Sequence, residues 1–123
     1  MLVCRGIRGA TTTGENTDAA IYAATRELLA QLIEANQVVE ENVAAAYFTV
    51  TTDLNAAYPA AAARQLGWNT TALMCSTEIP VPGSLPRCIR VMVLYNTDKS
   101  QREMVNIYLN GTDALRKQGV ESI

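Results

Sequence analysis

Residues 87–95, Arg-Cys-Ile-Arg-Val-Met-Val-Leu-Tyr, place a permanent cation inside an otherwise apolar run. A near-continuous run of aliphatic and aromatic side chains is typical of a buried β-strand that is covered on both faces. Arg90 lies in the middle of this run, and its guanidinium group cannot lose its proton in a protein. Burying that charge is costly unless an anion meets it. The sequence therefore predicts that Arg90 either pairs with a neighbouring carboxylate or binds an anionic ligand.

Histidine is absent from all 123 residues of the chain. This absence removes the commonest general base and the commonest metal ligand. Serine-histidine triads, zinc sites of the HExxH type and Cys-His nucleophile pairs are therefore excluded. The net charge is -2 and no basic block occurs, so we do not expect nucleic acid as a partner. Chemistry in this chain must depend on arginines, carboxylates, thiols, hydroxyls or backbone groups.

The length and composition fit one globular domain, with 49% apolar and 18% charged residues. We expect this domain to span residues 1–123, with a loose tail from about residue 118. No apolar run approaches the ~20 residues that cross a bilayer, so we expect no membrane partner. Arg5 and Arg8 interrupt the N-terminal run, unlike a signal peptide. Three widely spaced cysteines argue against a disulfide framework, and we predict a cytoplasmic location.

The order of predicted elements indicates an α/β (α+β) fold built on a single mixed sheet with helices on one side. Apolar periodicity predicts a long helix from an N-cap at Thr17 to near Asn36. Strands are predicted over residues 2–12, 43–50, 71–79, 87–95 and 107–109, and shorter helices over 60–66, 101–106 and 112–117. The other face of this sheet would be bare, so we expect it to pack against identical copies.

The candidate functional residues are arginines, one carboxylate, one thiol and two tyrosines: Arg8, Arg64, Arg90, Glu78, Cys75, Tyr58 and Tyr108. Paired arginines bind carboxylates through bidentate hydrogen bonds, which suits a small dicarboxylate ligand. Structural roles stay open at this point. Arg64 fits a solvated helix surface, Cys75 and Tyr108 fit core packing, and Glu78 fits an ion pair with Arg90.

Several segments in chain order carry a resemblance to a known family. They are Arg-Gly-Ile-Arg-Gly-Ala-Thr-Thr at 5–12, Thr-Asp-Leu-Asn-Ala-Ala-Tyr-Pro-Ala at 52–60, Cys75 with Glu78, and Cys-Ile-Arg-Val-Met at 88–92, continued by Tyr108-Leu109 and Leu115-Arg116. Together they resemble the monofunctional chorismate mutases of the small trimeric α/β class. The resemblance implies a homotrimeric pseudo α/β-barrel with active sites between subunits and no cofactor. It also implies the rearrangement of chorismate to prephenate in phenylalanine and tyrosine biosynthesis.

The resemblance also implies a role for each matching residue. Arg90 would lie beside the breaking ether oxygen and reach a carboxylate, while Arg8 and Tyr108 would contact carboxylates. Glu78 and the Cys75 region would hold the ring hydroxyl. The walls would be Tyr58, Ala60, Leu73, Met74 and Leu115, with Arg64 and Arg116 at the mouth.

The chain departs from the family pattern at two positions. Ala61 stands where relatives can carry lysine, and Tyr58 stands where relatives can carry phenylalanine. An alternative function is a non-catalytic trimeric protein that binds a small carboxylate metabolite. A third is a trimeric α/β enzyme that acts on imine or enamine metabolites. Loss of chorismate absorbance would distinguish the mutase from both.

Overall fold

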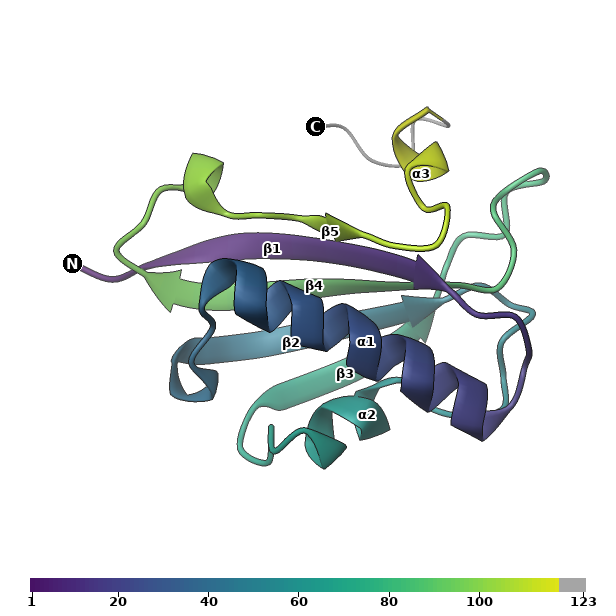
Figure 1. The fold of residues 1–123 in the computed structure, drawn as a ribbon, viewed down its shortest axis with the longest axis horizontal. Coiled ribbons are helices and arrows are strands. Elements are labelled where there is room, and N and C mark those ends of the chain that lie inside the picture. Colours follow the sequence, from purple (N-terminus) through teal and green to yellow (C-terminus); the bar gives the residue numbers. More distant parts are fainter. Residues whose placement is uncertain (118–123) are drawn as a thin grey trace.

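The computed structural model describes residues 1–117, apart from the side chains of residues 116 and 117, and its elements are shown in Figure 1. The strands are β1 (Val3–Thr12), β2 (Val43–Val50), β3 (Ala72–Thr77), β4 (Cys88–Thr97) and β5 (Ile107–Tyr108). The α-helices are α1 (Asp18–Asn36), α2 (Ala60–Gln65) and α3 (Ala114–Lys117), and short 3-10 helices span Glu40–Asn42 and Gln101–Glu103. The predicted tail from residue 118 lies outside the described residues. No helix within residues 1–117 is long and apolar enough to cross a bilayer.

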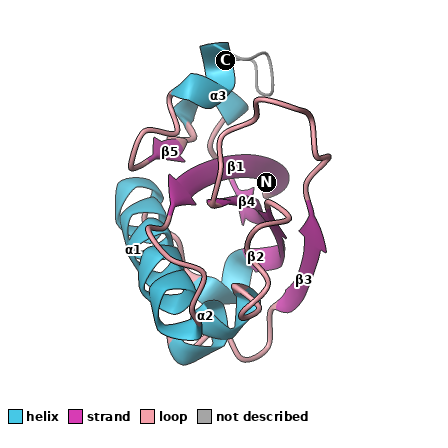
Figure 2. Cartoon of the chain, turned by 90° about the vertical axis from the view of Figure 1, so that its right-hand side faces the viewer, coloured by secondary structure: helices cyan, strands magenta, loops and turns pink. Residues whose placement is uncertain are grey.

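The five strands form one mixed sheet in the order β3-β2-β4-β1-β5. The central strand β4 is antiparallel to both β1 and β2, whereas β3 and β5 pair in parallel with β2 and β1 at the two edges. Helices α1 and α2 lie on the same side of this sheet (Figure 2). The predicted single mixed sheet with helices on one side is therefore confirmed.

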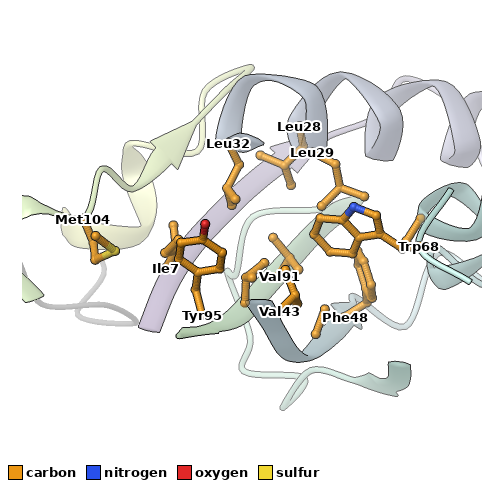
Figure 3. Packing of buried hydrophobic residues seen from close by; sticks show 13 residues of the cluster. Ile7, Leu28, Leu29, Leu32, Val43, Phe48, Trp68, Val91, Tyr95 and Met104 are labelled. Carbon is orange, nitrogen blue, oxygen red and sulfur yellow. The ribbon is translucent and has the colours of Figure 1, made fainter. Parts of the chain in front are cut away.

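Helix α1 begins and ends where its sequence pattern predicts. Thr17 has an extended backbone, and its hydroxyl accepts a hydrogen bond from the N–H of Ala20 at 3.1 Å, as an N-cap does. Leucines 28, 29 and 32 are completely buried against the sheet, where Phe48 and Trp68 complete the packing (Figure 3). Burial of each such side chain contributes about 1.5–3 kcal/mol, so this helix face is the main core of the fold.

The expected helix over residues 101–106 is wrong beyond its first turn. A 3-10 helix covers only Gln101–Glu103, where Ser100 and Glu103 form a capping box. The buried side chain of Asn36 then accepts a hydrogen bond from the N–H of Val105 at 2.8 Å and donates to its carbonyl at 2.9 Å. The Asn36 amide thus supplies the hydrogen bonds that a neighbouring strand would otherwise give to the backbone of Val105. This pairing keeps the chain extended into β5.

The expectation that β4 is covered on both faces also needs correction. Side chains alternate along a strand, and Val91 and Val93 are buried on the helix side while Met92 between them is 37% exposed. The sheet register places Met92 in one row with Arg8, Tyr47 and Met74. We call the side of the sheet that carries this row the helix-free face because neither α1 nor α2 covers it; the one-turn helix α3 borders its Ala10 end through Leu115. Its apolar side chains are exposed within one chain, with Tyr47 at 44% and Met74 at 62%.

Candidate active site

A second row of side chains crosses all five strands of the helix-free face. Arg90 on β4 pairs with Ala10 on β1 and with Thr49 on β2, while Ala10 also pairs with Tyr108 on β5 and Thr49 with Ser76 on β3. Paired residues in a sheet point to the same face. The sheet register therefore brings Arg90 and Tyr108, which are far apart in sequence, to either side of one alanine.

Arg90 forms an ion pair with Glu78, which follows β3. Its Nε donates to one carboxylate oxygen at 2.5 Å and its Nη2 donates to the other at 2.7 Å. The exposed fractions of the two side chains are 24% and 18%. The backbone N–H of Glu78 donates to the carbonyl of Val50 at 2.9 Å, which anchors the carboxylate beside β2. The sequence left open whether Arg90 pairs with a neighbouring carboxylate or binds an anionic ligand. In the structure it pairs with the carboxylate of Glu78.

The electrostatic environment keeps Glu78 ionised. Partial burial opposes ionisation, but the hydrogen bonds from Arg90 and from the hydroxyl of Thr49, together with the positive charge of Arg90, outweigh it. The pKa of Glu78 therefore lies below its ordinary value. An ionised carboxylate accepts hydrogen bonds and donates none, so Glu78 is an acceptor at neutral pH.

The ion pair lies at the wall of a cavity of about 580 Å³. Arg90 and Glu78 supply charge, while apolar contacts come from the loop over residues 79–86, from β4 and from α3: Val81, Leu85, Cys88 and Leu115. Cavities of about 300–1,000 Å³ with few polar groups and many apolar ones are typical of small-molecule sites. The arrangement fits a compact ligand that carries both negative charge and apolar surface.

Arg8, Tyr108 and Leu115 lie on the same side as Arg90. Arg8 stands two residues from Ala10 along β1, so it is a diagonal neighbour of Arg90 across the strand pair. Its backbone N–H donates to the side chain of Asn106 at 2.9 Å. Leu115 is 4% exposed and packs with Ala10 beside Tyr108. The side chain of Arg116 lies outside the described residues.

The remaining predicted site residues lie elsewhere in the chain. Leu73 and Cys75 on β3 pack against the helix-side core together with Ala60 of α2. Burial raises the pKa of the Cys75 thiol, and the backbone N–H of Ala60, directed at it, only partly offsets this. Arg64 is exposed on α2, and Tyr58 is 76% exposed just before that helix. We call these five residues the α2-side group: Tyr58, Ala60, Arg64, Leu73 and Cys75.

None of the α2-side group lines the 580 Å³ cavity within the described part of the chain. Met74, predicted as a wall beside Leu73, faces the opposite side of β3 from it, because adjacent residues of a strand alternate. Of the predicted site residues, Arg90, Glu78 and Leu115 line the cavity within the described residues. Arg8 and Tyr108 do not line it but stand near Arg90 in the sheet register, whereas the α2-side group is neither in the lining nor in that register.

Sequence reasoning missed Thr49, whose hydroxyl donates to Glu78. It also missed that residues 79–86 form a cavity wall. The proline-rich sequence of that loop indicates only that it lies outside a sheet. The pairing of Thr49 with Arg90 depends on strand register, for which the local sequence carries no signal.

Comparisons with known proteins agree on one family. The family model described as chorismate mutase type I matches residues 4–119. The chorismate mutase AroH of Thermus thermophilus is 52% identical over 113 residues, which cover 91% of this chain and 93% of that protein. The chorismate mutase AroH of Bacillus subtilis (strain 168) is 40% identical over 116 residues, covering 94% and 91%.

A solved structure is also similar. The chorismate mutase from Clostridium thermocellum superposes with a TM-score of 0.87 at 52% sequence identity, and the match covers 89% of this chain and 98% of that chain. Sequence and fold therefore agree over almost the whole length of both proteins.

Proposed function

Because this chain belongs to the chorismate mutase type I family, we propose that the cavity beside Arg90 binds chorismate and that Arg90 stabilises the transition state of its rearrangement. The protein is a chorismate mutase, an isomerase of aromatic amino-acid biosynthesis. The open question is how the residues of this chain perform the conversion of chorismate to prephenate.

The reaction breaks one carbon–oxygen ether bond and forms one carbon–carbon bond in the same molecule. No atom enters or leaves, so neither a nucleophile nor a proton donor is required, in keeping with a chain that has no histidine. The enzyme has to hold a flexible dianion in its compact reactive conformation. It also has to stabilise the negative charge that develops on the ether oxygen as the bond stretches.

The observation that carries the proposal is the bidentate pair between Arg90 and Glu78 at the cavity wall. A guanidinium has five N–H donors in one plane, and Glu78 accepts from two of them. This contact holds the plane in one orientation before substrate arrives. We propose that the remaining N–H groups of Arg90 donate hydrogen bonds to the ether oxygen and to a carboxylate of the substrate. The ionised Glu78 would accept a hydrogen bond from the ring hydroxyl.

Arg8 and Tyr108 are the proposed contacts of the substrate carboxylates. Both stand on the helix-free face close to Arg90 in the sheet register. A second cation beside Arg90 suits a dianionic substrate, and Leu115 supplies an apolar wall next to them. Arg8 and Arg90 of a single chain would thus provide one positive charge for each of the two substrate carboxylates.

The α2-side group is proposed to complete the site from a neighbouring copy in a homotrimer. Two observations support this: the group lies away from the cavity of its own chain, and the helix-free face exposes Tyr47, Met74 and Met92. An exposed apolar face of this kind usually marks an interface. Tyr58, Ala60, Leu73, Met74 and Cys75 would then form walls, and Arg64 and Arg116 would lie at the mouth. We further propose that residues 1–123 form one chorismate mutase domain located in the cytoplasm.

The direct test is chorismate absorbance during incubation with purified protein, wild type and Arg90→Ala in parallel. The proposal requires steady loss of absorbance with wild type and loss at least ~10³-fold slower with the variant. Binding of chorismate without loss of absorbance would instead favour a non-catalytic carboxylate binder.

A further inference from the structure

The end of β2 and the residue after it bond to Glu78 and to the strand that carries Arg90. The carbonyl of Val50 accepts from the backbone N–H of Glu78 at 2.9 Å, and the N–H of Thr51 donates to the carbonyl of Cys88 at 3.0 Å. Cys88 begins β4, two residues before Arg90. The end of β2 is therefore the common support of the carboxylate and of the strand that carries the guanidinium.

Asp53 extends this support to the turn that precedes β4. Its carboxylate oxygens accept from the backbone N–H of Arg87 at 2.9 and 3.2 Å, and the hydroxyl of Thr51 donates to the same carboxylate at 2.5 Å. That hydroxyl in turn accepts from the N–H of Cys88 at 2.9 Å. Two consecutive N–H groups at the start of β4 are thus held by the side chains of residues 51 and 53.

The turn that they hold is conformationally demanding. Arg87 has φ of 47°, in the left-handed region that residues other than glycine seldom adopt. Its carbonyl accepts from the N–H of Thr13 at 3.0 Å, and its Nε donates to the carbonyl of Thr13 at 3.0 Å. Contacts on both sides are the usual means by which such a backbone conformation persists. Asp53 supplies those on the N–H side.

This turn links two walls of the cavity. The loop over residues 79–86 ends at Arg87, and β4 with Cys88 and Arg90 begins directly after it. A change in the backbone angles of Arg87 would therefore move the loop wall relative to the guanidinium. Asp53 does not line the 580 Å³ cavity within residues 1–117, but it lines an adjoining cavity of about 240 Å³ that shares Thr51, Glu78 and part of the loop wall. Its hydrogen bonds connect it to the strand of Arg90 through the turn.

The charge state of Asp53 suits this task. Burial opposes ionisation, but the hydrogen bonds from Thr51 and from the Arg87 backbone together outweigh it and lower the pKa of Asp53. Hydrogen bonds to an ionised acceptor are shorter and about twice as strong as neutral ones. The carboxylate is therefore a strong clamp for the Arg87 N–H at neutral pH.

We propose that Asp53 is a positioning residue for catalysis: through Thr51 and the main chain of Arg87 and Cys88, it sets the position of Arg90 relative to the loop wall. The inference rests on the proposed role of Arg90 at the ether oxygen. A displacement of about 1 Å at a reacting centre can cost ~10²-fold in rate. The contact between Arg90 and the ether oxygen strengthens in the transition state. Loss of the Asp53 hydrogen bonds should therefore lower kcat more than it raises KM.

The test compares Asp53→Ala with Asp53→Asn, and uses Asp98→Ala as the matched exposed-aspartate control. We expect Asp53→Ala to lower kcat roughly ten- to a hundredfold with KM changed by less than about threefold. Asparagine keeps one acceptor oxygen but replaces the other with an uncharged NH₂ donor, so Asp53→Asn should lose kcat by an amount between wild type and Asp53→Ala. The control should match wild type. If Asp53→Ala does not fold, Asp53→Ser takes its place with a smaller loss of kcat expected.

A second readout does not depend on turnover. The NMR signal of the Arg90 Nε–H, assigned by its absence in Arg90→Lys, should shift in Asp53→Ala and remain unchanged in Asp98→Ala. Wild-type kcat in the folded alanine or serine variant, an equal loss in asparagine and alanine, or an unchanged Nε–H signal would each overturn the inference. Inactive wild-type protein would instead overturn the proposed function, which keeps the two failures distinct.

Discussion

Arg90 and Glu78 form a two-point contact in which each carboxylate oxygen of Glu78 accepts from a different nitrogen of Arg90. Arg90 lies in an apolar strand, and the carboxylate of Glu78 offsets the free-energy cost of burying its positive charge. Removing either partner leaves the other charge partly buried and uncompensated. The two residues share one role in stability, whereas the roles in catalysis that we propose for them differ, and substitutions can separate the two.

Arg90→Ala should lower kcat/KM by at least ~10³-fold, because it removes the cation that we propose to lie beside the developing oxyanion. Arg90→Lys should also fail badly, since a point charge on a flexible stem cannot reproduce a planar fork held by Glu78. Steady-state kinetics of both variants, with circular dichroism to verify the fold, provide the measurement. Recovery of activity in the lysine variant would mean that charge alone is sufficient.

Glu78→Gln should lose less activity than Glu78→Ala. Glutamine keeps an oxygen that can accept from the ring hydroxyl and from one N–H of Arg90, whereas alanine leaves the guanidinium without this anchor. The comparison is made on kcat at saturating chorismate and on kcat/KM at limiting chorismate. Equal losses in the two variants would point to a requirement for the negative charge of Glu78 rather than for its geometry.

The stability of the ion pair should depend on pH in a defined direction. The pKa of Glu78 is lowered in the folded protein from an ordinary value near 4.5, so the unfolded chain binds the proton more readily. The stabilisation is present above that ordinary value and is lost as the pH falls through the folded-state pKa. Urea unfolding of wild type and Glu78→Gln between pH 7 and pH 3 measures it. The difference between the two proteins should be constant near neutrality and shrink below about pH 4.5; a difference that grows in acid would contradict the assignment.

The sequence alone predicts much of this fold where local signals decide the structure. The N-cap at Thr17 and the apolar spacing through Leu32 predict a helix that ends near Asn36, as α1 does, and the apolar run of β2 coincides with the strand. Gly6 and Gly9 stand in the first strand, where glycine usually marks a bulge or a close approach. The close approach is confirmed, because a side chain at Gly9 would meet Leu28 of α1.

Distant contacts explain what the sequence could not predict. The extended backbone at Val105 depends on Asn36, which lies 69 positions away. The register that aligns Thr49 with Arg90 is equally invisible to a local pattern. The separation of the α2-side group from the residues near Arg90 could not be predicted either. The family resemblance implies one set of site residues, but no local sequence signal indicates whether one chain or two chains provide them. Leu73 and Met74 face opposite sides of β3, so they can both reach a ligand only if the site uses more than one surface.

Gly9→Ala should destabilise the fold through contact with α1. An added Cβ would lie 3.0 Å from Leu28 and 3.1 Å from Val91, tighter than ordinary packing allows. Overpacking of this kind costs about 1–3 kcal/mol in the free energy of unfolding. Gly14→Ala is the matched control because nothing lies within 4 Å of its added Cβ, and it should change stability by less than about 0.5 kcal/mol. Denaturant unfolding of both variants measures the difference, and equal midpoints would show that α1 shifts at little cost.

Two inactive variants should restore activity in mixed oligomers if the α2-side group acts on the cavity of a neighbouring copy. Arg90→Ala removes the cation of the cavity, and Arg64→Glu places a negative charge at the mouth, where it repels a dianion. In trimers refolded from equal amounts of both chains, a site is intact when its Arg90 comes from one variant and its Arg64 from the other. Random assembly makes about one quarter of the sites intact, so the mixture should recover roughly that share of wild-type turnover.

Affinity-tagged chains verify that mixed oligomers form. If they form without any recovery, Arg64 and Arg90 serve the same site from one chain, and the proposed interfacial arrangement is wrong.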